Sequence, residues 1–348
     1  NKLLSRAIGF YGEIGNKKNK SDNREMQSNI INVKGYESIT NEKVLDKWLK
    51  ILKEQSVIAV DTETSSLNPL EANLVGISFS YAPNKACYIP LAHKNIKGLK
   101  KEDVLKKVKP ILEDPSIKKV GQNIKFDFLI FSQNNIEITP LEDTMLISYT
   151  LDAGTNRHNL DTLSEIHLNH KTISYKELVG TGKNKLNFSD ITLEKATEYA
   201  AEDADVTLRL YNHLRARLDQ EKLNKIYENF EKPMVKLLSK LEFNGIKVDD
   251  IYLKKLSKNF EEKLKKIEKE IYSIASKEFN IASPKQLGEI IYNELKITKL
   301  KKTKKGSLAT SASILEDLAL AGHRFPNLVL QWRQISKLKN TYSDALQD

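Results

Sequence analysis

The stretch that decides the fold is IAVDTETSSL, residues 58–67. Its first three residues, together with Val57, form an apolar run, which predicts a strand buried in a sheet. Asp61 and Glu63 follow at once, and because side chains of a strand alternate between its faces, both carboxylates project from the same face. Two such carboxylates repel each other unless a cation lies between them or one is protonated. The alternative is a strand that simply ends in solvent, and these residues alone do not decide between the two.

Strands and helices alternate around this stretch. We expect strands at residues 36–40, 57–60, 74–82, 86–91 and 118–123. Helices are expected at residues 41–52, 102–113, 126–134, 143–152, 159–167 and 193–218, followed by 222–243 and 250–278. Such alternation predicts an α/β layer fold, and the purely helical pattern after about residue 141 predicts a helical C-terminal part. The composition changes near residue 220, where we place a domain boundary, and residues 1–35 are expected to form an N-terminal arm.

The charge of the chain points to a polyanionic partner. The 348 residues include 56 Lys and Arg against 46 Asp and Glu, a net charge of +10, and residues 221–348 hold 25 of the basic and 17 of the acidic residues. A positive C-terminal third suits nucleic acid, with binding that weakens as salt rises. The alternative is a set of Lys-rich helices whose charged faces are merely solvated.

Several classes of protein are excluded by the remaining composition. The single cysteine, Cys87, rules out a disulfide framework and a multi-cysteine zinc site, and it indicates a reducing compartment. Apolar stretches are too short for a membrane span, and the first residues carry too short an apolar core for a signal peptide, so we expect a soluble protein. The six histidines offer no pair of ligands at helical spacing, and we expect His158 and His167 to be structural.

Further acidic residues could complete a site around Asp61 and Glu63. Asp127 opens a helix after a short strand, where an Asp most often serves as a cap. Tyr199 and Asp203 are four residues apart on a predicted helix and therefore share one face, although a surface Tyr over an acidic helix would look the same. Together these side chains offer four carboxylates and a phenol, the ligand set that two hard divalent cations require.

The sequence resembles the proofreading part of bacterial DNA polymerase I and other family A DNA polymerases. Segments 59–67, 121–127 and 199–208 resemble the three exonuclease motifs of the Asp-Glu-Asp-Asp superfamily, in the subgroup with Tyr in the third motif. The resemblance continues in the same order through 157–165, 170–186, 243–249, 279–287 and 332–344, and so covers about residues 36–348. It implies a ribonuclease H-like exonuclease fold, a mixed central sheet flanked by helices, at 36–218, followed by an all-α start of the polymerase thumb at 219–348.

The same resemblance implies a mechanism of two-metal-ion hydrolysis with Mg²⁺, or with Mn²⁺ in its place. Asp61, Glu63 and Asp203 would hold the ion that activates the attacking water. Asp61 would also bridge to a second ion, which Asp127 holds largely through water. Tyr199 would orient the attacking water, and Glu63 would share that task.

Other positions of the resemblance concern the DNA. Leu67 is expected to wedge against the terminal base. At position 126 the family often has Tyr where this chain has Phe126, which keeps the aromatic contact but lacks the hydroxyl. The expected DNA-binding residues are Leu67, Gln122, Asn123, Phe126, Arg157 and Tyr175. The implied partners are a single-stranded 3′ end and a primer–template duplex of DNA. We expect the protein to act as a monomer and not to bind a membrane.

The C-terminal part carries further expectations. KLKKTKKGS, residues 299–307, is either a basic loop near duplex phosphates or a solvated Lys loop, and Trp332 is expected in a helical core. No palm or fingers motif occurs before Asp348, so this chain should not extend a primer, and the palm and fingers would lie in a longer parent protein.

Two other functions and one location stay open at this point. One alternative is a stand-alone exoribonuclease of the RNase D kind, which shares the acidic motifs, although the thumb-like C-terminal part argues against it. The other is a non-catalytic DNA-clamping domain with a decayed nuclease site, against which the retention of all four acids and Tyr199 argues. Within family A, the Lys- and Asn-rich composition resembles polymerases of the apicoplast, the plastid-like organelle of malaria parasites, and implies that location.

Overall fold

The computed structural model describes residues 31–96, 98–182, 185–298 and 308–347, to which all structural statements below apply. Most of the predicted arm, residues 1–30, and the basic segment 299–307 lie outside these ranges. Contacts between Cα atoms divide the chain into two compact units, the first up to Gly245 and the second from Ile246 onwards. Each unit is described by itself.

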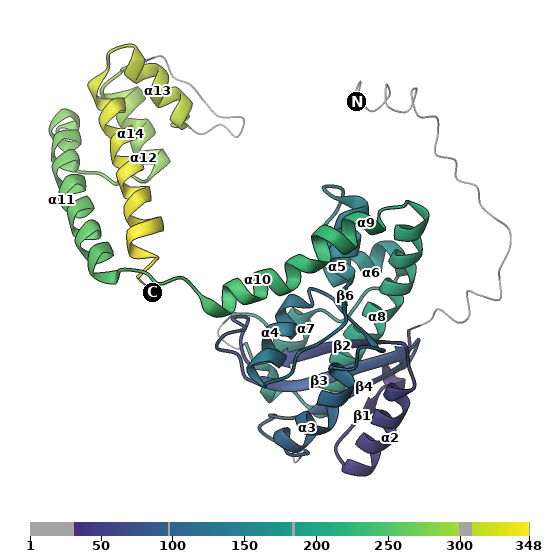
Figure 1. The fold of residues 1–348 in the computed structure, drawn as a ribbon. Coiled ribbons are helices and arrows are strands. Elements are labelled where there is room, and N and C mark those ends of the chain that lie inside the picture. Colours follow the sequence, from purple (N-terminus) through teal and green to yellow (C-terminus); the bar gives the residue numbers. More distant parts are fainter. Residues whose placement is uncertain (1–30, 97, 183–184, 299–307, 348) are drawn as a thin grey trace, which may run out of the picture. The chain divides into compact units, whose positions relative to one another are not determined.

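The first unit is built on a mixed six-stranded sheet with the order β1-β4-β3-β2-β5-β6 (Figure 1). Strand β2 lies between β3, to which it is antiparallel, and β5, to which it is parallel. The strands are β1 (Glu37–Ser38), β2 (Val57–Thr64), β3 (Leu74–Ala82), β4 (Lys85–Pro90), β5 (Lys118–Gly121) and β6 (Leu141–Asp143). The five predicted strands are confirmed, and β6 is an addition, because three residues are too short to show a periodicity.

Helices cover both faces of this sheet. They are η2 (Val33–Gly35), α2 (Glu42–Lys53), α3 (Lys101–Leu112), α4 (Lys125–Gln133), α5 (Thr144–Asp152), α6 (Leu160–Leu168), α7 (Tyr175–Val179), η4 (Phe188–Asp190), α8 (Leu193–Gln220), α9 (Asn224–Ile226), η5 (Tyr227–Glu231) and α10 (Lys232–Asn244). The capping residues follow from the sequence: the Asn41 side chain accepts from Val44 N at the start of α2, and Asp143 caps α5 as predicted.

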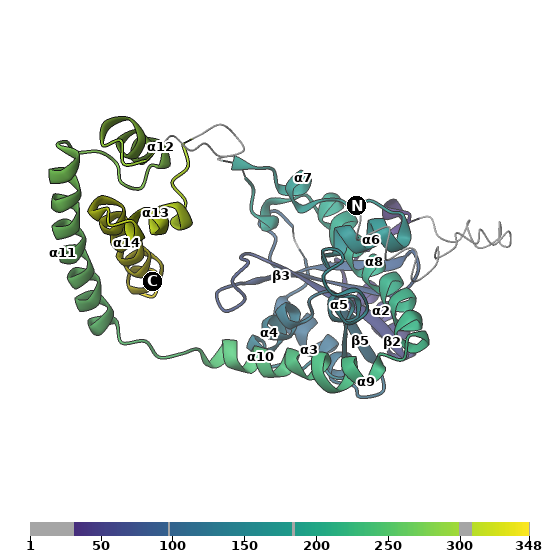
Figure 2. The ribbon, with the colours of Figure 1, turned by 90° about the horizontal axis from the view of Figure 1, so that it is seen from above.

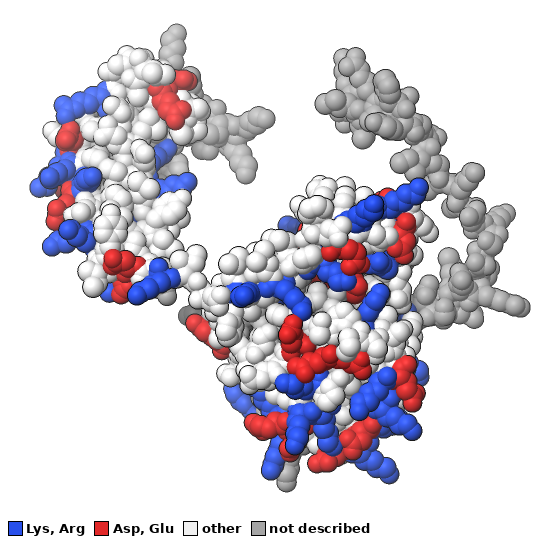
Figure 3. Space-filling view, viewed as in Figure 1, with Lys and Arg blue, Asp and Glu red and all other residues white. Residues whose placement is uncertain are grey.

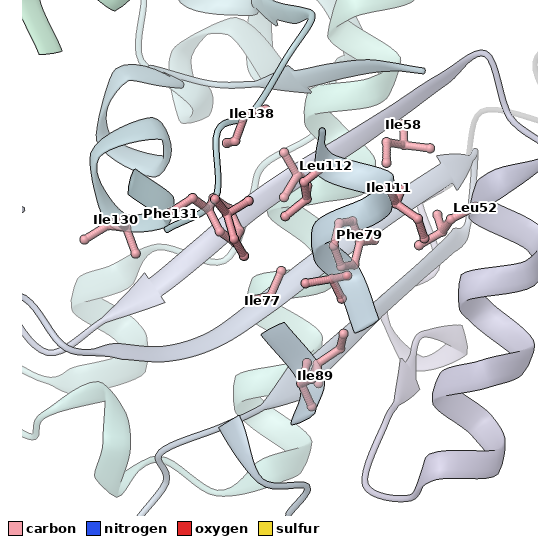
Figure 4. Close-up of a cluster of buried hydrophobic side chains, with 14 of the residues drawn as sticks. Leu52, Ile58, Ile77, Phe79, Ile89, Ile111, Leu112, Ile130, Phe131 and Ile138 are labelled. Carbon is pink, nitrogen blue, oxygen red and sulfur yellow. The ribbon is translucent and has the colours of Figure 1, made fainter. Parts of the chain in front are cut away.

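One face of the sheet packs against α2, α3 and α4 (Figure 4). Ile58 and Val60 of β2 and Ile77 and Phe79 of β3 contribute to this core and are almost fully buried. Replacing a buried aromatic residue such as Phe79 with Ala typically costs about 3–5 kcal/mol. This core fixes β2 in register and so decides which of its residues point to the other face.

The opposite face packs against α5, α6 and α8. Val57 and Ala59 of β2 lie here, and Ala59 clusters with Ala204 and Leu208 of α8. Helix α8 crosses the sheet and contacts β1, β2, β3, β4 and β5. Ala59 and Ala204 are fully buried, and their small side chains let the helix approach β2 closely.

The second unit is entirely helical apart from an isolated bridge residue. It contains α11 (Asp250–Ala275), α12 (Pro284–Glu289), η6 (Ile290–Glu294), α13 (Ala312–Leu320), α14 (Arg324–Lys337) and η7 (Leu338–Asp344). Helix α11 runs beside α14 in both views (Figures 1 and 2), and Trp332 packs against their common core, as predicted.

Charged side chains on the second unit are mixed in sign. Lys and acidic residues alternate along the edge formed by α11 in Figure 3. Two of these pairs bridge successive turns, Lys254 to Asp250 at 3.4 Å and Lys265 to Glu261 at 2.6 Å. Within the described ranges, no helix has the length and apolarity that a membrane crossing requires.

Candidate active site

Strand β2 and helix α8 bring three carboxylates together. Asp61 and Glu63 continue the face of β2 that begins with Val57 and Ala59, the face that packs against α8. Asp203 lies on α8, one residue before Ala204, which contacts that face. The pairing of β2 with β3 shifts register between Glu63 and Thr64, an irregularity of the kind often found next to active sites.

These three carboxylates fit a divalent metal ion. One oxygen from each of Asp61, Glu63 and Asp203 lies within 4.8 Å of the other two. Burial raises the pKa of all three carboxyl groups well above ordinary values, and the charges of neighbouring carboxylates raise them further. Oxygen donors this close can be ionised together only if a cation offsets their repulsion, and such donors are those that Mg²⁺ prefers. Among the described residues, no other group of three or more His, Cys, Asp or Glu could hold a metal ion.

Asp127 reaches the site from the opposite side of β2. Thr62, between the two acids, points towards α4, and its Oγ1 donates to Asp127 Oδ1 at 2.6 Å. Asp127 lies in the first turn of α4 and is only 2% exposed. Burial, followed by the charge of Asp61, raises its pKa well above the ordinary value. Asp127 therefore interacts electrostatically with the triad while its side chain is fixed by Thr62.

Tyr199 lies one turn before Asp203 on α8, which confirms that the two share a face. Its hydroxyl lies close enough to the Asp203 carboxylate for the two groups to shift each other's pKa. Burial and the charge of Asp203 raise the pKa of Tyr199 far above its ordinary value, so the phenol keeps its proton. The rings of Tyr175 and Phe188 each lie 6.1 Å from the Tyr199 ring, measured between centroids, and hold it in place.

The acids open into a cleft of about 430 Å³. Leu67 lies at the rim of this cleft with 88% of its surface exposed, so it is free to contact a bound molecule. The lining consists of Asp61, Thr62, Glu63, Thr64, Ser65, Ser66, Leu67, Phe126, Tyr175, Lys185, Tyr199 and Asp203. The structure therefore brings Leu67, Phe126 and Tyr175 together with the triad, and their contact with DNA stays a prediction.

Four of the predicted residues do not line this cleft: Asp127, which Thr62 holds on the other side of β2, and the three expected DNA-binding residues Gln122, Asn123 and Arg157. Gln122 donates from Nε2 to the carbonyl of His158 at 2.7 Å, so it fixes the loop that carries Arg157. Asn123 has a left-handed backbone with φ 58, and its N–H donates to Asp143 Oδ1 at 3.1 Å. Arg157 is exposed. Their contact with a nucleic acid stays a prediction.

Some residues of the site were not predicted. The Lys185 ammonium lies 5.6 Å from the centroid of the Tyr175 ring and adds a positive charge to the cleft. Glu202, next to Asp203, accepts from Ile173 N at 2.7 Å and so anchors the segment that leads to Tyr175. For Lys185 the sequence does give a weak signal, because it lies in segment 170–186, which also contains Tyr175. Nothing local distinguishes Glu202 from a solvated acid.

Sheet, flanking helices and an acidic cleft at the end of a central strand define a ribonuclease H-like exonuclease fold. Residues 36–219 match the family described as 3′-5′ exonuclease, and residues 250–348 match DNA polymerase family A. The chain therefore belongs to the family A DNA polymerases and contains their 3′-5′ exonuclease domain followed by the start of the polymerase domain.

Similar proteins agree with this assignment. DNA polymerase I of Rhizobium leguminosarum is 43% identical over 331 residues, which are 89% of this chain and 33% of that protein. DNA polymerase I of Borreliella burgdorferi is 40% identical over 317 residues, 90% of this chain and 34% of that protein. A solved structure, the POL domain of Pol1 from M. smegmatis in complex with DNA primer-template and dNTP, has a TM-score of 0.72 at 23% identity. The match covers 89% of this chain and 50% of the M. smegmatis chain, and it shows that the two share a fold. The chain spans about a third of the length of these curated relatives.

Proposed function

We propose that residues 36–219 remove 3′-terminal nucleotides from single-stranded or mispaired DNA and so proofread for a family A DNA polymerase during replication. The observation that carries this proposal is the triad of Asp61, Glu63 and Asp203, with oxygens within 4.8 Å of one another in a cleft rimmed by an exposed leucine. The family match at residues 36–219 supports it.

The roles of the acidic residues are those that the resemblance implies, and the proximity of Asp61, Glu63 and Asp203 supports them. Asp61, Glu63 and Asp203 would hold one divalent ion, and Asp127, together with Asp61, would hold a second. When bound, two such ions, Mg²⁺ or Mn²⁺, supply positive charge to the attacking and leaving oxygens of phosphodiester hydrolysis. The protonated hydroxyl of Tyr199 orients the attacking water, and Glu63 shares this task.

The preference for unpaired ends has a physical basis in the cleft. A terminal nucleotide must be unstacked and unpaired before it can enter, and this costs less at a mismatch. Leu67 would separate the terminal base from its neighbour, while the rings of Phe126 and Tyr175 contact the bases. The Lys185 ammonium would neutralise a phosphate, and Gln122, Asn123 and Arg157 would lie along the strand beyond the cleft.

The remaining expectations extend this proposal to the whole protein. The exonuclease domain would span 36–218 and the thumb would begin at 219, with palm and fingers in a longer parent chain that acts as a monomer on primer–template DNA. The complex of the M. smegmatis structure with DNA primer-template supports DNA as the partner. An apicoplast location stays a prediction to which the bacterial relatives reported above lend no support.

The proposal is tested by removing two ligands of the triad. Purified wild-type chain and the double variant Asp61→Ala, Glu63→Ala are incubated with Mg²⁺ and a 5′-labelled single-stranded oligonucleotide, and shortening from the 3′ end is followed on a gel. We expect the variant to lose activity by on the order of 10³-fold or more, because the ions lose their shared ligands. The matched control is Glu261→Ala, Glu262→Ala, two exposed acids of α11 that should leave the rate unchanged.

Two further arms decide the nature of the substrate. The same oligonucleotide made of RNA should be degraded more slowly than the DNA, and faster degradation of RNA would favour the exoribonuclease alternative. Calorimetric titration with Mn²⁺ should show divalent binding by the wild type, since a decayed, DNA-clamping site would bind none. Degradation of DNA by the double variant at a near-normal rate would contradict the proposed site.

A further inference from the structure

A second cavity lies in the first unit, and it shares no lining residue with the acidic cleft. It has a volume of about 320 Å³ and lies where the end of α6, the second half of α8 and the turn between β3 and β4 meet. Its lining consists of Ile31, Pro83, His167, Leu168, Arg209, Asn212 and His213. Apart from the apolar residues, the lining offers a guanidinium, two imidazoles and an amide, and no carboxylate.

The guanidinium of Arg209 is buried with part of its donor capacity unused. The residue is only 7% exposed, and its Nε donates to both carboxylate oxygens of Asp205 at 3.2 Å. Asp205 also accepts from the Tyr36 hydroxyl at 2.9 Å and from the Asn84 N–H at 3.1 Å, so several donors fix this carboxylate. Arg209 Nη2 is buried as well, and among the described residues it has no hydrogen-bond partner.

The neighbouring imidazole repeats this pattern. His167 Nε2 is buried and also has no hydrogen-bond partner within the described ranges. The ring of His213 lies beside it, with centroids 5.1 Å apart. A buried donor without an acceptor costs about 1–3 kcal/mol, and more if it is charged, so this cavity is built to receive a group that accepts hydrogen bonds.

The hydrogen-bond donors of the cavity favour an anion over a cation. Burial lowers the pKa of both imidazoles, and the charge of Arg217 lowers both further. The charge of Arg209 is paired with Asp205 and that of Arg217 with Asp152 and Glu221, so the cavity attracts an anion through its unused N–H donors and through the lack of a carboxylate in its lining. An oxyanion presents several acceptor oxygens at once and can take the Arg209 Nη2 donor and an imidazole N–H together.

We propose that this cavity binds a phosphate group, held by Arg209 Nη2 and by the rings of His167 and His213. The group comes either from a free phosphate or nucleotide or from the backbone of a nucleic acid strand that passes the end of α6. The site is separate from the acidic cleft, and it does not depend on the hydrolytic function proposed above.

The test is a titration of the full chain, labelled with ¹⁵N in its histidine rings, with inorganic phosphate. EDTA is present throughout, so that no divalent ion can hold phosphate in the acidic cleft. We expect saturable shifts of the His167 and His213 ring signals in heteronuclear NMR spectra, with a dissociation constant on the order of 1 mM. Sodium chloride at matched ionic strength should not reproduce them, and His323, in the second unit, serves as an internal reference.

Two variants connect the shifts to the proposed donors. His213→Ala removes an exposed ring and should weaken phosphate binding by about tenfold, and Arg209→Lys, which keeps the charge beside Asp205, by at least as much. Arg215→Lys, on the same helix but outside the lining, should bind as the wild type does. If Arg209→Lys does not fold, the titrations of the wild type and of His213→Ala still show whether the cavity binds phosphate.

A repeat with a single-stranded oligonucleotide identifies the source of the phosphate. Shifts of His167 and His213 that inorganic phosphate reverses by competition would assign the cavity to the nucleic acid backbone. Shifts with inorganic phosphate alone would assign it to free phosphate or a nucleotide. Equal shifts of all histidines, or no saturable change at His167 and His213, would overturn the proposal.

Discussion

Removal of one charge from the triad should stabilise the protein when no divalent ion is present. The substitution is Asp203→Asn, which keeps the size of the side chain and an acceptor for the Tyr199 hydroxyl. The carboxylate oxygens lie within 4.8 Å of one another, so each ionised pair costs at least about 3.5 kcal/mol at an effective dielectric constant of 20, and ionised Asp203 beside Asp61 and Glu63 costs at least about 7 kcal/mol. Keeping it protonated at pH 8 costs about 6 kcal/mol instead, given its ordinary pKa of 3.8. We therefore expect the variant to gain about 3–6 kcal/mol at pH 8.

The gain should depend on pH in a defined direction. The pKa values of Asp61, Glu63 and Asp203 are raised in the folded state above the ordinary 3.8 and 4.5. The contribution of these carboxyl groups to the free energy of unfolding is therefore fully present below about pH 4. It is lost as the pH rises through their raised pKa values in the folded state. In EDTA, wild-type stability should fall as the pH rises above 4, and Asp203→Asn should fall less steeply.

The assay is urea unfolding in EDTA at several pH values, followed by tryptophan fluorescence. Trp48 lies in the first unit and Trp332 in the second, so a Trp332→Phe background reports on the exonuclease domain alone. Addition of Mg²⁺ should stabilise the wild type more than the variant. The exposed acid Glu165 provides the control, since Glu165→Gln should change little. Equal stability of wild type and Asp203→Asn across this pH range in EDTA would refute the electrostatic reasoning.

Three further substitutions test single features of the fold and the cleft. Tyr199→Phe should slow hydrolysis by about 10–100-fold yet keep Mn²⁺ binding in calorimetry, because the phenol orients water and holds no metal; loss of binding would contradict this role. Leu67→Ala should reduce the exonuclease rate on paired 3′ ends more than on single strands, because the exposed leucine separates stacked bases; an equal reduction on both would argue against a wedge. Gly76→Ala would place a Cβ 2.1 Å from the buried Tyr88 hydroxyl and should destabilise the protein by about 2–4 kcal/mol in urea unfolding. Gly35→Ala, whose nearest neighbouring atom would be 3.6 Å away, is its control, and comparable losses for both would show that the contact with Tyr88 is unimportant.

Local periodicity was sufficient to predict which residues in the central part of the site share a face. Alternation along a strand places Asp61 and Glu63 on one face, and a spacing of four on a helix places Tyr199 beside Asp203. Both relations depend only on backbone geometry within a few residues. The mixed sheet flanked by helices could be predicted for the same reason, since each long element shows its own period.

Contacts between distant segments could not be predicted in this way. The bond from Thr62 to Asp127 joins residues 65 positions apart, and the bond from Ile173 to Glu202 joins residues 29 apart. Such pairs are set by the packing of whole elements, and in the sequence a buried Glu202 looks like any acid on a charged helix. Strand β6 was not predicted for a different reason. It is defined by its pairing with β5, and its three residues are too few to show a periodicity.

The alternation along β2 also limits how this site can change during evolution. Three successive residues serve two faces, with Asp61 and Glu63 towards α8 and Thr62 towards Asp127. Insertion or deletion of one residue before them would exchange the faces, placing both carboxylates against the apolar core and a hydroxyl in the cleft. Substitutions can tune the cleft one position at a time, but a change of chain length here removes the site and the core together.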